Sequence, residues 1–125
     1  MELRVLEETL ALARLAADAA VPAWVAGRDF LAVVRTPREL SIVCRDDAVP
    51  ATHAEVERGF RAFAVVGTLD FALTGIVASL ATPLAEAGIS IFGISTYDTD
   101  HILVREDRLN DAKAVLAAAG HTVRQ

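Results

Sequence analysis

The sequence predicts an α+β fold of two small modules, residues 1–59 and 60–125, with antiparallel sheets and helices on one face. Two observations support this prediction. The second half alternates strand-like and helix-like apolar patterns in the order β-α-β-β-α-β, which is the ferredoxin-like order. The first half shows an abbreviated version of the same pattern, in which the helices shrink to single turns.

The elements of the second module follow from its hydrophobic periodicity. Apolar residues at positions 73, 76, 77, 80, 84 and 87 repeat at helical spacing and form one buried stripe. We expect Thr74 to cap this helix, Pro83 to kink it and Gly88 to end it in the left-handed conformation. The other expected elements are strands over 60–66, 89–94, 101–104 and 121–124 and an amphipathic helix over 107–119.

The first module centres on a predicted hairpin. Residues 30–36 and 40–45 are apolar and rich in β-branched side chains, and a Thr-Pro-Arg turn signal separates them. The run 10–16 suits either a strand or a helix, and a short helical turn is expected near Pro22. Residues 54–59 are expected to form one helical turn.

The composition favours a cytoplasmic homodimer. Apolar residues make up 54% of the chain and the mean hydropathy is +0.40, yet no run reaches the ~18 apolar residues of a membrane span. The surplus therefore predicts burial between subunits. A net charge of −5 argues against a nucleic-acid partner, and acids at the N-terminus argue against an export signal. The lone Cys44, within an apolar run, is interpreted as a small buried hydrophobe.

A candidate binding site surrounds the predicted helix start at residues 70–76. The first turn of a helix offers N–H groups and the positive end of its dipole, which together hold an anion such as a carboxylate. Gly75 would let a ligand approach the backbone, and Phe71 and Leu73 could form an apolar wall. The alternative is purely structural: Asp70 and Thr74 cap the helix, and Gly75 allows close packing.

The segment Ser95-Thr96-Tyr97-Asp98-Thr99-Asp100 supplies the second part of the candidate site. We interpret Asp98 as a turn residue. Asp100 opens an apolar strand, where a charge needs a partner, and is the better ligand candidate. The three histidines show no metal-ligand spacing, and no nucleophile with an oriented base is evident, so no metal, cofactor or catalytic residue is expected.

The stretch GIVASLATPLAEAGISIFGISTYDTDHILV, followed by LNDAKAVL, resembles an ACT domain. Its nearest resemblance is to tandem ACT modules of the aspartate-kinase and CASTOR types, which bind amino acids and regulate enzymes by pairing. The resemblance implies a ligand between the 70–76 loop and a partner module. It also implies that Asp100 holds the positive group of the ligand, and that N–H groups of residues 74–76 hold its α-carboxylate.

We therefore expect a regulatory protein that binds an amino acid and has no catalysis of its own. The expected ligand-binding residues are Asp70, Phe71, Leu73, Thr74, Gly75, Ile76, Ser95, Thr96 and Asp100. A regulated enzyme or protein partner is expected as well. Two alternatives stay open: an assembly module without a ligand, and a small enzyme that uses Asp98, Asp100 or His101 as acid and base.

Overall fold

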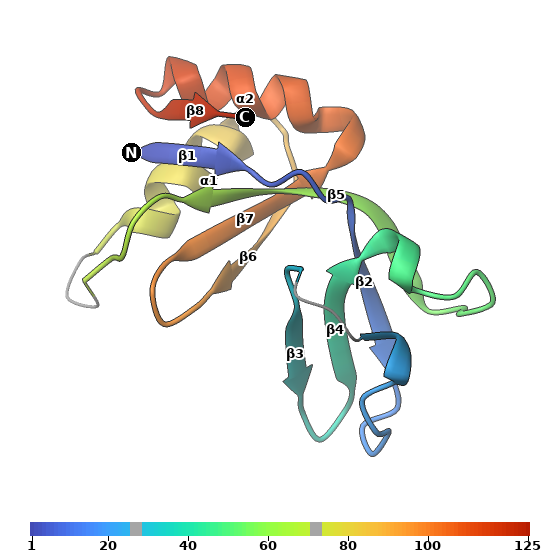
Figure 1. The fold of residues 1–125 in the computed structure, drawn as a ribbon. Coiled ribbons are helices and arrows are strands. Elements are labelled where there is room, and N and C mark those ends of the chain that lie inside the picture. Colours follow the sequence, from blue (N-terminus) through green and yellow to red (C-terminus); the bar gives the residue numbers. More distant parts are fainter. Residues whose placement is uncertain (26–28, 71–73) are drawn as a thin grey trace. The chain divides into compact units, whose positions relative to one another are not determined.

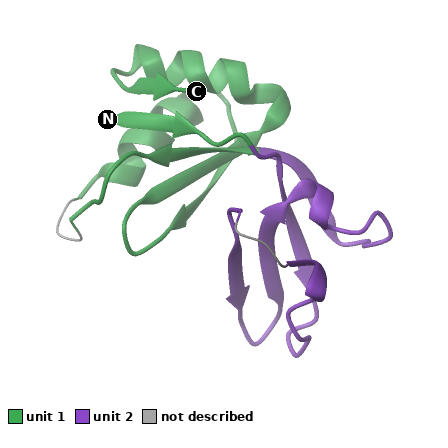
Figure 2. Cartoon of the chain, viewed as in Figure 1, with its two compact units in different colours: residues 1–7, 61–125 green, residues 8–60 purple. Residues whose placement is uncertain are grey.

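The computed structural model describes residues 1–25, 29–70 and 74–125. It divides the chain into two compact units, residues 1–7 with 61–125 (unit 1) and residues 8–60 (unit 2), shown in Figure 2. The expected domains were 1–59 and 60–125. The first seven residues are therefore wrongly placed in that division, because they form a strand of unit 1.

Unit 2 has a ferredoxin-like element order in which short 3₁₀ turns stand in place of both helices (Figure 1). Its elements are β2 (Leu10–Leu15), η1 (Ala23–Val25), β3 (Ala32–Arg35), β4 (Leu40–Arg45), η2 (Asp46–Ala48) and the first part of β5 (Val56–Val65). The strands are ordered β3-β4-β2-β5, and all three pairings are antiparallel. The predicted hairpin is confirmed as β3–β4.

Strand pairing decides two segments of unit 2 whose structure the sequence left open or predicted wrongly. Residues 10–16, which suited either a helix or a strand, form β2 because six of them pair with β4. Residues 54–59 were expected to be a helical turn, but β5 starts at Val56 and pairs with β2. Arg58 also holds this segment, since its guanidinium donates to the Asp46 carboxylate and to three backbone carbonyl groups.

Unit 1 contains the β-α-β-β-α-β order that the sequence predicts, with one strand added. The predicted elements are the end of β5, α1 (Ile76–Glu86), β6 (Ile91–Ser95), β7 (Asp100–Arg105), α2 (Leu109–Ala118) and β8 (Thr122–Arg124), with a 3₁₀ turn, η3 (Glu106–Arg108), before α2. The added strand is β1 (Glu2–Val5), and it lies antiparallel to β5 and parallel to β8. The sheet order is therefore β6-β7-β5-β1-β8.

Both helices of unit 1 pack on one face of its sheet, as predicted (Figure 1). Alternate residues of each central strand point to this face, which is the periodicity expected of a strand with one face against helices. The fully buried members with the largest side chains are Leu3, Phe63, Leu80, Leu84, Ile102, Val104 and Leu116. This core fixes where α1 begins relative to the turn between β6 and β7.

The ends of α1 differ in how well the sequence predicts them. Gly88 follows the helix with φ 73°, as predicted, and Ile89 N–H donates to the Leu84 carbonyl at 2.9 Å. The start at Thr74 is wrong. Gly75 is the N-cap, with φ 75° and ψ 7°, and no side chain caps the helix.

Candidate functional site

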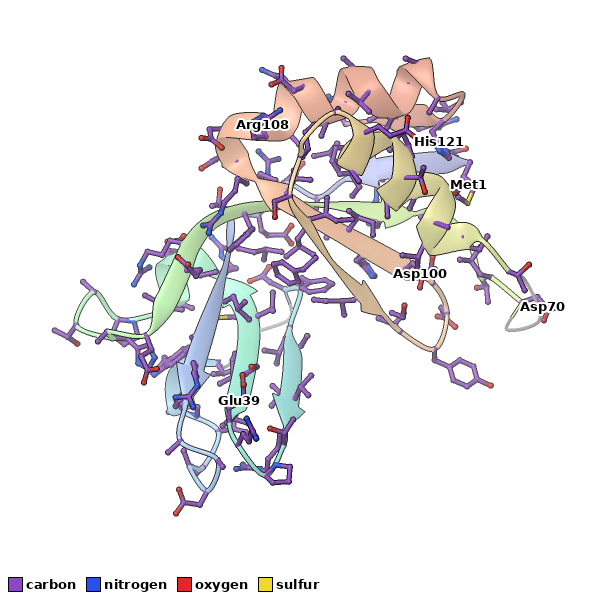
Figure 3. All side chains as sticks on the ribbon, turned by 180° about the vertical axis from the view of Figure 1, so that it is seen from behind. Met1, Glu39, Asp70, Asp100, Arg108 and His121 are labelled. Atoms are coloured by element: carbon purple, nitrogen blue, oxygen red, sulfur yellow. The ribbon has the colours of Figure 1, made fainter. Side chains whose placement is uncertain are left out.

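A pocket of about 350 Å³ lies in unit 1 between the start of α1 and the β6–β7 hairpin. Figure 3 shows Asp70 on the chain leading into α1 and Asp100 beside that end of the helix. One wall comes from residues 69–70 and 75–78 and the other from residues 95–100. The described lining residues are Leu69, Asp70, Gly75, Ile76, Val77, Ala78, Ser95, Thr96, Tyr97, Asp98, Thr99 and Asp100.

The helix wall offers backbone N–H groups. The Gly75 carbonyl accepts the first helical hydrogen bond, from Ser79 N–H at 2.9 Å. The N–H groups of Ile76, Val77 and Ala78 therefore have no partner within the helix, and these residues line the pocket. Because no side chain caps this helix, its positive end is open to an anion.

The hairpin wall holds an oriented carboxylate. Ser95 and Asp100 are opposite each other across β6 and β7, and Ser95 Oγ donates to Asp100 Oδ1 at 2.5 Å. Asp100 is half-buried, so this bond restricts its carboxylate to one orientation at the edge of the pocket. Thr96 and Thr99 close the turn through three mutual hydrogen bonds, which include both their backbones and the Thr96 hydroxyl.

Two hydrogen bonds join the hairpin to the segment that ends β5 and leads into α1. Leu69 N–H donates to the Asp98 carbonyl at 2.7 Å, and Thr99 Oγ1 donates to the Val65 carbonyl at 2.8 Å. These bonds set the spacing of the two pocket walls. Asp98 lies in the turn, as interpreted from the sequence. It is the backbone carbonyl of Asp98 that accepts the hydrogen bond from Leu69.

The electrostatics of the pocket have two parts. Asp70, Asp98 and Asp100 bring three carboxylates, and no lysine, arginine or histidine is among the lining residues that the structure describes. The α1 N-terminus brings partial positive charge. A zwitterion fits this arrangement, since its carboxylate can meet the helix N–H groups while its cationic groups meet the carboxylates.

His101 follows Asp100 on β7 and is half-buried on the opposite sheet face. Burial lowers the pKa of this imidazole. This effect outweighs the hydrogen bond that the imidazole donates to the Ile94 backbone and the charge of Asp100, both of which raise the pKa. The neutral form of His101 is therefore favoured. Within the described parts of the chain, no group of three histidine, cysteine, aspartate or glutamate residues is arranged to hold a metal ion.

The structure brings together six of the nine predicted ligand-binding residues: Asp70, Gly75, Ile76, Ser95, Thr96 and Asp100. Thr74 is exposed and is not among the described lining residues. Phe71 and Leu73 lie outside the described residues. Sequence reasoning did not predict the lining residues Leu69, Val77, Ala78, Tyr97 and Thr99, and it assigned Asp98, which also lines the pocket, to the turn alone. With Gly75 as the N-cap, the first turn of α1 includes Val77 and Ala78, so the position of the N-cap is the signal that predicts them as lining residues.

Comparison with protein families matches an ACT domain to residues 55–118, which is just over half of the chain. The chain belongs to the ACT-domain family. The β-α-β-β-α sequence from β5 to α2 is therefore its ACT module. A second family model, described as an N-terminal domain, matches residues 8–52, which lie within unit 2 of this ACT-domain protein.

Curated relatives include the cytosolic arginine sensor for mTORC1 subunit 1 of Homo sapiens and of Bos taurus. Each is 50% identical to this ACT-domain protein over 48 residues, which are 38% of this chain. The matched segment spans 15% of the length of each of these relatives.

Solved structures extend the likeness to nearly the whole chain. A structural-genomics protein of Agobacterium tumefaciens is 43% identical, covers 98% of this chain and 90% of its own, and superposes with a TM-score of 0.91. The aspartate kinase of Clostridium acetobutylicum has the same fold over 90% of this ACT-domain protein and 33% of its own chain, with a TM-score of 0.69 and 13% identity.

Proposed function

We propose that this ACT-domain protein is a regulatory module that binds a free amino acid in the pocket between α1 and the β6–β7 hairpin, without catalysis of its own. One observation carries the proposal. The uncapped N-terminus of α1 and the Asp100 carboxylate, held by Ser95, line the same pocket. Their charges complement the α-carboxylate and a cationic group of one small ligand.

A basic amino acid, arginine or lysine, is the proposed ligand class. Three carboxylates line the pocket, and no basic side chain is among the described lining residues. After one carboxylate neutralises the α-ammonium of the ligand, negative charge is left for a second cationic group on its side chain. The relatives named as cytosolic arginine sensors agree with this choice. That name also supports a cytoplasmic location.

The proposed mechanism is linkage. A ligand that binds one arrangement of modules more tightly than another stabilises that arrangement, with typical coupling of about 1–3 kcal/mol. We propose that the protein acts as a homodimer, that a partner module completes the site, and that ligand occupancy regulates an enzyme or another protein. The high apolar content of the chain supports the homodimer.

A thermal-shift screen of the twenty amino acids tests the function. A ligand present at 100 times its Kd adds about 2.7 kcal/mol to folding stability, which raises the melting temperature by several degrees. We expect arginine or lysine to produce this shift. A screen in which no amino acid raises the melting temperature would favour an assembly module without a ligand.

Asp100→Asn tests the residue assignment. The amide keeps the size of the side chain and removes its charge, so the ligand-induced shift should disappear while the ligand-free protein stays folded. Asp98→Asn is the comparison variant: it removes one lining carboxylate and keeps the backbone carbonyl that Asp98 contributes to the structure, so it should reduce the ligand-induced shift without abolishing it. An arginine shift that persists in Asp100→Asn and is lost in Asp98→Asn would reverse the assignment.

A further inference from the structure

The β3–β4 hairpin of unit 2 has the same turn as the β6–β7 hairpin of unit 1 (Figure 1). In each turn a threonine N–H donates to the carbonyl three residues later at 2.8 Å, from Thr36 to Glu39 and from Thr96 to Thr99. The hydroxyl of each threonine accepts from the N–H of that later residue, at 3.1 Å in unit 2 and 3.2 Å in unit 1. Residues at matching positions of the two hairpins can therefore be compared.

The strands next to the two hairpins match as well. Unit 2 has the order β3-β4-β2, and unit 1 has the order β6-β7-β5. In each unit the segment after the third of these strands leads into a helical element, which is η1 in unit 2 and α1 in unit 1. The place in unit 2 that corresponds to the unit 1 pocket is therefore between residues 16–22 and the β3–β4 turn.

The two hairpins differ in the pair of residues next to the turn. In unit 1, Ser95 is opposite Asp100, and the serine holds the carboxylate at the edge of the pocket. In unit 2, Arg35 is opposite Leu40. Leu40 is fully buried in the core of unit 2, on the same strand face as Ile42. At this place unit 2 therefore carries a cation and an apolar residue instead of a carboxylate.

The Arg35 guanidinium binds backbone carbonyls of the segment between β2 and η1. It donates to the carbonyl of Ala17 and, at 2.7 Å, to the carbonyl of Ala19. The segment turns here, since Ala19 N–H donates to the Ala16 carbonyl at 3.0 Å. A guanidinium holds its N–H groups in a rigid planar fork, so one such group can reach both carbonyls.

We propose that the Ala17 and Ala19 carbonyls form a guanidinium site that Arg35 of the same chain occupies, so that the chain takes up one free amino acid, in unit 1. Unit 1 presents a carboxylate to a cation from solution, whereas unit 2 presents carbonyls to a cation of its own. In addition, η1 has three residues and is too short to offer the row of N–H groups that α1 offers. The number of ligands rests on the proposed function, and the guanidinium site does not.

Chemical rescue of Arg35→Ala tests the guanidinium site without any amino acid. The variant should melt at a lower temperature than the wild type, and methylguanidinium chloride should restore more than half of that loss. Methylammonium chloride at the same concentration should restore little, because an ammonium lacks the planar fork. Arg38→Ala is the matched control: it removes the same charge from the same turn, and neither salt should raise its melting temperature. Equal effects of the two salts on Arg35→Ala, or equal rescue of the control, would overturn the proposal.

Equilibrium dialysis of the wild-type chain tests the number of ligands. With arginine or lysine, whichever the thermal-shift screen identifies, binding should saturate at one per chain, and Asp100→Asn should abolish it. A second saturable site that persists in Asp100→Asn would overturn the inference and leave the proposed function standing. A screen without any hit would instead remove the proposed function, and the methylguanidinium experiment would still decide whether Arg35 occupies a guanidinium site.

Discussion

The His121 imidazole hydrogen-bonds through Nε2 to the Ser79 carbonyl at 3.0 Å. The reason lies one turn further along α1. Pro83 has no N–H, so the carbonyl four residues before it lacks its helical donor. A carbonyl only accepts, so Nε2 carries the hydrogen, and Nδ1 accepts from the Met1 backbone nitrogen at 3.0 Å. The residue just before β8 thus replaces the hydrogen bond that Pro83 removes from α1.

This relationship predicts that His121→Ala destabilises the protein by about 1 kcal/mol, the usual net value of such a hydrogen bond. The variant Pro83→Ala restores a backbone donor to the Ser79 carbonyl. In the Pro83→Ala background, His121→Ala should therefore cost less. A double-mutant cycle in urea measures the difference. Equal costs in both backgrounds would contradict the compensation.

Gly75→Ala should destabilise the protein by about 1–2 kcal/mol, because its φ of 75° is unfavourable for residues with a Cβ. The added Cβ would meet no heavy atom within 4 Å, so the cost comes from the backbone alone. Gly93→Ala is the matched control. Its Cβ would lie 3.6 Å from Ile102 Cδ1, an ordinary contact, and we expect little change in the urea midpoint.

Thr99 is predicted to hold the pocket walls together through its hydroxyl. Thr99→Val removes the hydrogen bond to the Val65 carbonyl and should cost about 1 kcal/mol. It should also weaken the melting shift produced by the ligand, since the hairpin is then less firmly fastened. Thr99→Ser keeps the hydroxyl and should retain both properties. Identical ligand shifts in the two variants would show that this bond does not shape the pocket.

Acidification should destabilise the protein through His101. Burial holds the pKa of this residue below its ordinary value of 6.5, so the unfolded chain binds more protons between the two values. Stability is therefore lost as the pH falls from about 7 through the folded pKa. His101→Gln should lessen the fall in melting temperature between pH 7 and pH 5. An unchanged fall would assign the pH dependence to other groups.

Local patterns predicted the elements of the ACT module well, and long-range pairing limited the rest. The helical stripe of α1 and the glycine after it are local signals, and both elements formed as expected. No local signal shows that β1 would join β8 over a separation of more than one hundred residues. Likewise, residues 56–59 belong to β5 because β2 is beside them, which their own sequence does not indicate.

The sequence predicted correctly which two segments of the chain form the candidate site. Acids and glycine near a helix start indicated residues 70–76, and the Ser-Thr-Asp pattern indicated residues 95–100. Which residues of the first segment line the pocket depends on which residue is the N-cap of α1. Thr74 has the side chain expected of a cap, but Gly75 takes that position because it tolerates a left-handed backbone. Tyr97 and Thr99 line the pocket because of how the hairpin turns, which side-chain type alone does not indicate.

The pairing of β1 with β8 constrains how the protein can be synthesised and divided. During synthesis, β1 emerges more than one hundred residues before its parallel neighbour β8, and it must wait for that neighbour to be made. Unit 2 meets no such delay, because its strands, including the start of β5, all lie within residues 8–60. We expect unit 2 to order before unit 1, because unit 1 cannot complete its sheet until residues 122–124 have been made. A fragment of residues 61–125 would lack β1, so the edge of β5 that pairs with β1 should be exposed.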